Sequence, residues 1–349
     1  MTDTVKKPDV GSMNISELQE FFVSIGEPKF RAKQLFSAYA AGKYINEITN
    51  FSNALREKLS KSVEYRMPQI EQKQVSKLDG TVKYLFRLHD GEYVESVLMK
   101  YAHGNTICVS SQVGCRMGCA FCASTIGGKV RDLTPSEIYG QVCAAQRDSG
   151  ERIGGIVMMG IGEPLDNFDN VIKFLELVNS PDGLNIGYRH ISLSTCGIVD
   201  KILKLSEKNL PITLSISLHS TTQEERERLM PIAKKFGIDE LLSACRKYIE
   251  NGGRRISFEY TMIEGENDSE EDALRLAKLL SGMLCHVNLI PLNTVKGRDY
   301  RKSAKTSIQK FISVLEKRGI TATVRRRLGS DIDASCGQLR ASKIESPAK

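Results

Sequence analysis

Short apolar segments alternate with amphipathic helical patterns over most of the chain, and this alternation restricts the possible folds more than any other feature. The apolar segments are TICVSS, GGIVMMG, HISLST, ITLSISLH, RISFEYTM and HVNLIP, and a helical pattern lies between each one and the next. Repeated strand–helix units form parallel sheets with crossover helices. We therefore expect an α/β fold with a partial (β/α)6 barrel, because a closed barrel of eight units needs a longer chain.

The segments on either side of this core predict additional units. Ser16 and Gln19 have the spacing of a capping box and predict the start of a first helix, whereas Thr134, Pro135 and Glu137 predict the start of the first core helix. Two alternating stretches joined by HDGE predict a β-hairpin. The expected division is a flexible tail (1–12), an N-terminal helical accessory domain that binds RNA (13–75), a β-hairpin extension (76–100), the core barrel (101–328) and a C-terminal segment with a catalytic cysteine (329–349).

Polar or glycine-rich motifs follow five of the six predicted strands. They are a cysteine loop after the first strand, GIGEP after the second, STCG after the third, SLHS after the fourth and NLIPLN at the sixth. Ligands of parallel α/β sheets bind at the carboxyl ends of the strands. The five motifs are therefore expected to form one site.

The nine cysteines do not have the pattern of a disulfide framework. Their number is odd, their spacing is irregular, and the N-terminus lacks the apolar core of a signal peptide, so we expect a reducing, cytoplasmic environment. Cys115, Cys119 and Cys122 have the spacing C-x3-C-x2-C, which indicates an iron–sulfur cluster, with a zinc site or three core thiols as the alternatives. The isolated cysteines expected to be ordinary buried thiols are Cys143, Cys196, Cys245 and Cys285.

The cysteine loop, with Phe121 before its last cysteine, resembles that of the radical S-adenosylmethionine (SAM) superfamily. The resemblance implies that the three cysteines hold a 4Fe-4S cluster whose fourth iron binds SAM. An electron from a donor such as flavodoxin or ferredoxin then cleaves SAM to a 5′-deoxyadenosyl radical. GIGEP stands where the superfamily has a GGE-like motif, so Glu163 is expected to bind the SAM amino group, and Gly160 and Gly162 to allow close backbone approach.

Two further cysteines, Cys108 and Cys336, narrow the resemblance to the RlmN type of dual-specificity 23S rRNA and tRNA adenine-2 methyltransferases. The matching stretches are KFRAKQ, YVESVLM, CVSSQVGCRMGCAFCAS, MMGIGEPLDN, ISLSTCG, SISLHS, MPI, VNLIPLN and DIDASCGQL. The resemblance implies that Cys336 takes a methyl group from one SAM, and that a radical made from a second SAM removes hydrogen from this group. The methylene radical adds to C2 of adenine, and Cys108 helps to release the product by forming a disulfide with Cys336.

The same resemblance assigns roles to further residues. Glu95 matches the family's proton acceptor, although by itself it resembles a carboxylate on a strand surface. The implied SAM contacts are Gly162, Glu163, Ser194, Ser217, Leu218, His219 and Asn293. Without the resemblance, His219 at the end of an apolar strand would be interpreted as an ordinary hydrogen-bonded histidine.

Positive charge is concentrated near the C-terminus. The chain has a net charge of +7, and residues 296–349 contain 14 Lys and Arg against 5 Asp and Glu. This distribution indicates a polyanionic partner such as RNA, with a solvated basic surface as the alternative. We expect KGRDYRKSAK and VRRRLGS to contact 23S rRNA or tRNA. No apolar run is long enough for a membrane span, and we expect a monomer because one chain supplies every catalytic group.

Three other functions compete with this interpretation. The nearest is the Cfr type of adenine-8 methyltransferase, which shares the cysteines and confers antibiotic resistance. Three residues match the adenine-2 type and not this alternative: Val113, Pro164 and Pro291. One residue departs from the adenine-2 type, because Leu292 replaces a tryptophan that is common there. The second is a metal-stabilised RNA-binding module without catalysis, which leaves GIGEP unexplained. The third is a radical SAM enzyme that acts on a protein or small molecule, which does not need Cys336.

Overall fold

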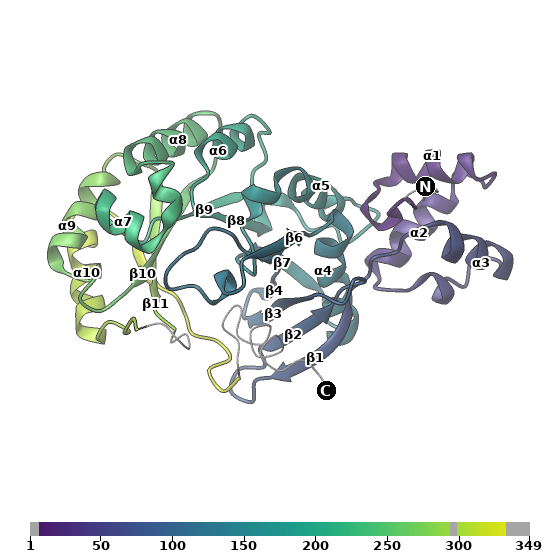
Figure 1. Cartoon of the computed structure of the whole chain (residues 1–349), viewed down its shortest axis with the longest axis horizontal. Helices are drawn as coiled ribbons and strands as arrows, with labels where there is room; N and C mark the ends of the chain where they lie inside the picture. Colours follow the sequence, from purple (N-terminus) through teal and green to yellow (C-terminus); the bar gives the residue numbers. More distant parts are fainter. Residues whose placement is uncertain (1–6, 294–298, 333–349) are drawn as a thin grey trace.

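The computed structural model describes residues 7–293 and 299–332 and shows a curved sheet with helices along its outer side (Figure 1). The strand order of this ten-stranded sheet is β1-β2-β3-β4-β7-β8-β9-β10-β11-β12. Pairing is antiparallel from β1 to β4 and parallel from β4 to β12. Within the described residues β1 does not pair with β12, so the sheet is an open, partial barrel, as predicted.

The structure confirms the six predicted parallel strands. They are β4 (Gly104–Cys108), β7 (Ile153–Met158), β8 (Ile191–Thr195), β9 (Thr213–Ser217), β10 (Ile256–Met262) and β11 (Cys285–Pro291). The structure adds a seventh parallel strand, β12 (Ala322–Val324), which pairs with β11. Two of the three residues of β12 are exposed, so its sequence has no apolar run that would predict a strand.

The crossover helices also agree with the sequence pattern. The predicted helices are α4 (Pro135–Ser149), α5 (Phe168–Asn179), α6 (Val199–Ser206), α8 (Ile238–Glu250) and α9 (Glu270–Leu279), and the structure adds α7 (Gln223–Leu229) and α10 (Lys305–Lys317). Thr134 caps α4 as expected: its hydroxyl accepts from the Glu137 N–H, and the Glu137 carboxylate accepts from the Thr134 N–H. The 3-10 helices are η1 (Val10–Ser12), η2 (Ile45–Glu47), η3 (Ala123–Thr125), η4 (Pro164–Asn167), η5 (Tyr188–His190) and η6 (Pro231–Lys234). No helix in the described part of the chain is long and apolar enough to cross a membrane.

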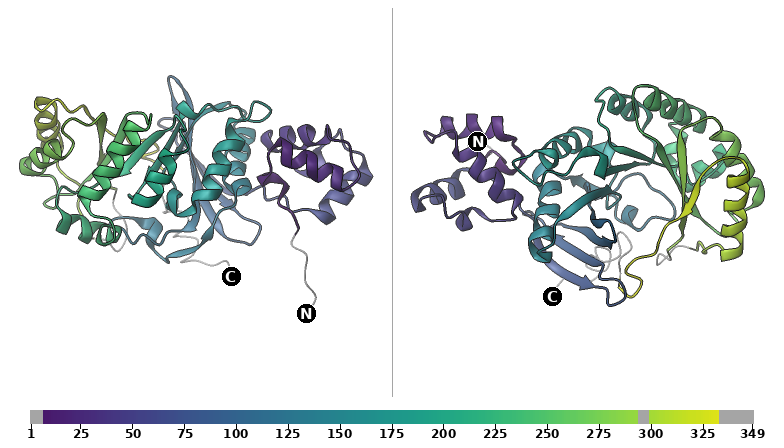
Figure 2. Two further views of the ribbon diagram at one scale, coloured as in Figure 1. Left: turned by 90° about the horizontal axis from the view of Figure 1, so that it is seen from above. Right: turned by 180° about the vertical axis from the view of Figure 1, so that it is seen from behind.

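The N-terminal helices form a separate small module beside α4 and α5 (Figure 2). They are α1 (Ile15–Ser24), α2 (Arg31–Ala40) and α3 (Asn53–Ser62). The predicted cap at Ser16 is wrong, because Asn14 caps α1: its side chain accepts from the Glu17 N–H at 2.9 Å, and Glu17 accepts from the Asn14 N–H at 2.7 Å. Asn-x-x-Glu is a capping box of the same form, and it begins two residues earlier.

The module is attached to the amino end of α4 by buried polar contacts. The Ser136 hydroxyl donates to Asp9 at 2.6 Å, and the Ser136 N–H donates to the Ser12 hydroxyl at 3.0 Å. Tyr39 donates to the Ser136 carbonyl at 2.9 Å. Gln141 of α4 in turn accepts from the Ser96 hydroxyl of β3 and from the Ser110 N–H, so α4 connects the module to the sheet.

An antiparallel extension continues the barrel sheet beyond β4. The expected hairpin is present as β2 (Val82–Arg87) and β3 (Tyr93–Tyr101), and β3 pairs directly with β4. A further strand, β1 (Gln69–Val75), pairs with β2 although it lies in the range assigned to the helical domain. Six of its seven residues are exposed, so the two faces of β1 do not differ in polarity and its sequence does not alternate.

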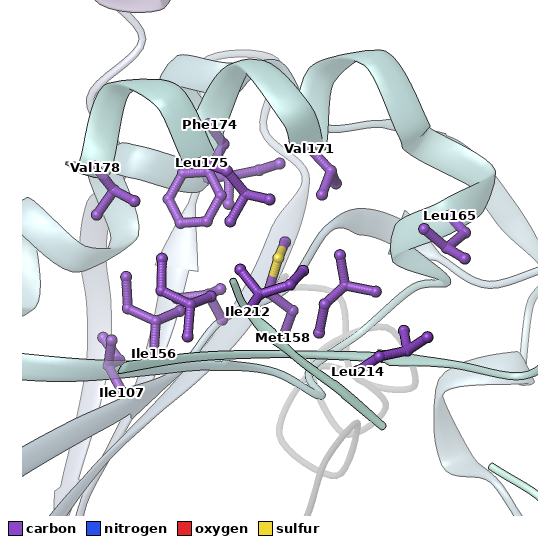
Figure 3. Packing of buried hydrophobic residues seen from close by; sticks show 14 of the residues in the cluster. Ile107, Ile156, Met158, Leu165, Val171, Phe174, Leu175, Val178, Ile212 and Leu214 are labelled. Atoms are coloured by element: carbon purple, nitrogen blue, oxygen red, sulfur yellow. The ribbon is translucent and has the colours of Figure 1, made fainter. Parts of the chain in front are cut away.

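The barrel core lies between the sheet and its helices. Figure 3 shows Val171, Phe174 and Leu175 of α5 above Ile156 and Met158 of β7, and all five side chains are almost fully buried. Burial of a large apolar side chain stabilises the fold by roughly 1.5–3 kcal/mol. This packing holds β7 in place, and the GIGEP motif follows directly from its carboxyl end.

Candidate active site

The expected motifs meet in one cavity of about 620 Å³ at the carboxyl ends of the parallel strands. Among the residues lining it are ten predicted site residues: Cys108, Cys115, Cys119, Cys122, Gly162, Glu163, Ser194, Ser217, His219 and Asn293. Glu95 and Leu218 do not line this cavity, and Cys336 lies outside the described residues. The expectation of one site at the strand ends is therefore confirmed, although the role of each residue in it stays a prediction.

The cysteine loop lies between two short antiparallel strands, β5 (Gln112–Gly114) and β6 (Lys129–Asp132). Asp166 of η4 holds both sides of this loop: it accepts from Gln112 and Lys129, each at 2.9 Å, and it pairs with Arg116. At the far end of the loop, the Ala120 N–H donates to the Leu229 carbonyl of α7 at 2.9 Å. The three cysteines therefore stand on a loop that is anchored to the barrel at several points.

The thiols of the loop fit an iron–sulfur cluster. Burial raises the pKa of Cys115 to about 12 and raises the pKa of Cys119 still further, so without a cation both thiols are protonated at pH 7. Bound iron deprotonates a thiol ligand. In the described part of the chain no three metal-ligating side chains converge closely enough for a single ion. A 4Fe-4S cluster does not require this convergence, because each cysteine binds a different iron.

The glycines of GIGEP approach the chain's own backbone, not only the cavity. A Cβ at Gly160 would lie 2.6 Å from the Val109 carbonyl oxygen, and a Cβ at Gly162 would lie 2.6 Å from the Gln112 Cβ. Gly162 also has a φ of +108°, which favours glycine. These close approaches are made within the chain, to Val109 and to Gln112, the first residue of β5.

We expect Gly162→Ala to destabilise the apoprotein by about 1–3 kcal/mol, because it adds both backbone strain and a clash. Denaturant unfolding would measure this loss. The matched control is Gly154→Ala, since Gly154 lies in β7 with an ordinary φ and open space around its Cα. We expect the control to change the free energy of unfolding by less than about 0.5 kcal/mol. Equal stability of the Gly162 variant and the wild type would contradict the strain argument.

Glu163 is held in one orientation by backbone donors. Its two carboxylate oxygens accept from the Leu165 N–H at 3.0 Å and from the Cys196 N–H at 2.8 Å. Burial raises the pKa of this carboxyl. Side-chain hydrogen bonds with Thr195 and Cys196 add to these and favour the charged form of the carboxyl. The carboxylate lies in the cavity wall, where it can face an ammonium group. Cys196, expected to be an ordinary core thiol, lines the cavity beside Glu163; its position at the end of a predicted strand was the signal available in the sequence.

His219 is both an internally bonded histidine and a cavity residue. Its Nδ1 accepts from the Thr261 N–H at 3.0 Å, and its ring makes an edge contact with Phe121 of the cysteine loop, with ring centroids 4.9 Å apart. Burial lowers the pKa of His219 to about 3, so the ring is neutral at pH 7. With Nδ1 as acceptor, Nε2 carries the proton and is a donor.

Glu95 and Leu218 lie just beyond the cavity lining. Glu95 forms a buried ion pair with Lys83 at 2.5 Å, and it shares a face of β3 with Val97 and Met99, which do line the cavity. Leu218 is fully buried and uses its backbone: its N–H donates to the Glu259 carbonyl at 3.1 Å. The predicted contact of Leu218 with SAM therefore stays a prediction.

The family models match two parts of the chain. Residues 109–277 match the radical SAM superfamily, and residues 9–64 match the N-terminal domain of ribosomal RNA large subunit methyltransferases. The chain is 54% identical over 339 residues to a probable dual-specificity RNA methyltransferase RlmN of Lachnospira eligens, with 97% of each chain covered. It is 52% identical over 344 residues to that of Alkaliphilus metalliredigens, with 98% of each covered. The chain belongs to the RlmN family.

A solved structure has the same fold over nearly the whole chain. It is a radical SAM methyltransferase from Sphaerobacter thermophilus, 39% identical, with a TM-score of 0.91 and coverage of 95% of this chain and 98% of that one. These relatives confirm the predicted family and enzyme class, a radical SAM RNA methyltransferase, and do not favour the adenine-8 alternative. Membership of the superfamily also implies a 4Fe-4S cluster and SAM as the cofactors of this RlmN-family protein.

Two buried charged residues lie just beyond the cavity lining, and no sequence pattern predicted them. Lys83 is fully buried against Glu95, and Arg226 is fully buried against the ends of β8 and β9. Lys83 belongs to a predicted strand in which apolar and polar residues alternate, and this position is only a weak signal that its side chain is buried. Arg226 stands among Glu and Arg residues in QEERERL, and nothing in that pattern distinguishes it from an exposed side chain.

Proposed function

We propose that this protein methylates C2 of an adenosine in the peptidyl transferase region of 23S rRNA and of the adenosine 3′ to the anticodon in tRNAs. The reaction uses two SAM molecules per turnover and proceeds through a methylated Cys336. The observation that carries the proposal is the cavity itself, in which Cys108, the loop cysteines and Glu163 face the same space. The wall of this cavity also includes Ile332, four residues before Cys336.

In this proposal Cys115, Cys119 and Cys122 bind the cluster, and polar groups at the strand ends hold SAM. Glu163 accepts from the SAM amino group. The SAM carboxylate and ribose are bonded by other residues that line the same cavity: Ser194, Ser217, His219 and Asn293. When bound, the cluster and SAM supply a 5′-deoxyadenosyl radical by one-electron cleavage of SAM. Cys115, Glu163 and His219 are buried in the cavity wall, which limits the access of water to a reactive radical.

Three further residues act on the RNA in this proposal: Cys336, Cys108 and Glu95. C2 of adenine lies between two nitrogens and is electrophilic, so the methyl group is first transferred to the Cys336 thiolate as a nucleophile. Cys108 lies at the carboxyl end of β4 against Val97 and Met99, on the cavity wall. In this proposal it releases the methylated RNA by forming a disulfide with Cys336. Glu95 accepts the proton from C2, and Lys83 balances the charge of its carboxylate.

RNA reaches this cavity past a basic rim. Arg325, Arg326, Arg327 and Lys302 line the cavity, and within the described residues none of them forms an ion pair with a carboxylate. Their charges are available for phosphates next to the target adenosine, which must leave its stack to enter. We further propose that the protein acts in the cytoplasm as a monomer and receives electrons from a flavodoxin or ferredoxin.

Nucleoside mass spectrometry tests this function. The anaerobically reconstituted protein is incubated with SAM, a reductant and either protein-free 23S rRNA or tRNA, and the digested RNA is analysed for methylated adenosines. We expect 2-methyladenosine in both. If the product were 8-methyladenosine, the protein would be an adenine-8 enzyme with the same cofactors. If SAM were cleaved without methylation of RNA, the proposed substrate would be wrong.

A further inference from the structure

Arg226 connects α7 to the carboxyl ends of two central strands. Its Nη2 donates to the Cys196 carbonyl at 2.7 Å, after β8, and to the Ser217 carbonyl at 3.4 Å, in β9. Its Nε donates to the Leu218 carbonyl at 3.3 Å. Arg226 is the largest fully buried side chain in the described part of the molecule.

The buried charge of Arg226 has no carboxylate partner among the described residues. Its hydrogen bonds go to three neutral carbonyl groups, and its Nη1 is buried without a hydrogen-bond partner. A guanidinium remains protonated in proteins. An isolated buried charge is strongly unfavourable unless an anion compensates it. An anion bound near Arg226 would compensate this buried charge.

The cysteine loop is the neighbour that would hold this anion. Leu229 of α7, three residues after Arg226, accepts from the Ala120 N–H at 2.9 Å, and Met230 lines the cavity. Cys196, whose carbonyl accepts from Arg226 at 2.7 Å, lines the same cavity as the three loop cysteines. His219 does not supply a second positive charge here, because its pKa is lowered to about 3.

We propose that Arg226 is the counter-charge of the cluster bound by Cys115, Cys119 and Cys122 and that it raises the reduction potential of this cluster. The inference rests on the proposed binding of the cluster by these cysteines. A 4Fe-4S cluster with three thiolates has one net negative charge when oxidised and two after it accepts one electron from a low-potential donor. A nearby cation therefore stabilises the reduced cluster more than the oxidised cluster. The step moves one electron from the donor to the cluster; no bond forms or breaks, and no proton moves.

Potentiometric titration of the reconstituted protein tests this role. Reduction is followed by electron paramagnetic resonance of the reduced cluster, without RNA and without turnover. We expect Arg226→Gln to lower the equilibrium constant for reduction by about tenfold or more, which is about 59 mV for one electron. Arg226→Lys retains the charge and is expected to change this constant by less than about threefold. The matched control is Arg228→Gln on the same helix, since Arg228 is exposed and pairs with Glu266, and it should have the wild-type potential.

Each outcome has a distinct meaning. A wild-type potential in Arg226→Gln, with full iron content, would overturn the inference and show that Arg226 only holds the strand ends. If Arg226→Gln did not fold, Arg226→Met would be titrated in its place, with the same expected drop in the equilibrium constant for reduction. A tenfold drop of this constant in Arg226→Lys would also overturn the inference, because that variant keeps the positive charge. Failure of the wild-type protein to bind iron would instead refute the proposed function of the cysteine loop.

Discussion

Cys119→Ala is expected to abolish both cluster binding and SAM cleavage. Cys119 is the central cysteine of the loop and lines the cavity with Cys115 and Cys122. In the proposed site each of the three thiolates binds a different iron, so the loss of one removes a ligand, and two cysteines are not expected to retain the cluster. We expect iron content, the visible absorption of the cluster and formation of 5′-deoxyadenosine all to fall to the detection limit after anaerobic reconstitution.

Cys285→Ala is the matched control for this experiment. Cys285 is a half-buried thiol at the amino end of β11, whereas the cavity lies at the carboxyl ends of the strands. The control should keep wild-type iron content and SAM cleavage. A Cys119 variant that retained a full cluster would show that the C-x3-C-x2-C spacing is not the ligand set of this protein.

Cys108→Ala is expected to convert the enzyme from a catalyst into a trap for its RNA. In the proposed mechanism Cys108 acts after the methylene carbon of Cys336 has joined C2 of adenine, so its removal leaves formation of the adduct intact and blocks release. Cys108 is buried and packs against Val97 and Met99, so we expect its replacement by alanine to leave a small cavity. We expect a covalent protein–RNA species that survives a denaturing gel, and multiple turnover that falls to background.

Two variants define the specificity of that result. Cys143→Ala, which removes a fully buried thiol inside α4, should turn over normally and leave no adduct. Cys108→Ala combined with Cys336→Ala should abolish the adduct, because the linking sulfur is absent. Normal turnover by the single Cys108 variant would mean that another group resolves the intermediate.

Local periodicity predicted most of the barrel because its strands and helices are buried in a regular way. Ile156 and Met158 of β7 belong to an apolar run, and Val171, Phe174 and Leu175 of α5 recur on one helical face. Periodicity does not predict strands whose burial is irregular. Both β1 and β12 are largely exposed and pair through their backbones, so their side chains do not show that they are strands. The cap of α1 was predicted at Ser16 instead of Asn14 because two overlapping segments each contain an acceptable capping box.

The sequence by itself determined the type of chemistry, because a short loop with C-x3-C-x2-C followed by GIGEP carries its ligands at fixed spacings along the chain. Only the tertiary structure decided which other groups surround that loop. Gly162 is required because Gln112, 50 residues earlier in the sequence, occupies the space of its Cβ. Arg226 is a buried cation because α7 turns it toward the ends of β8 and β9. Such contacts depend on distances between segments far apart in the chain, and no local pattern of residue types encodes them.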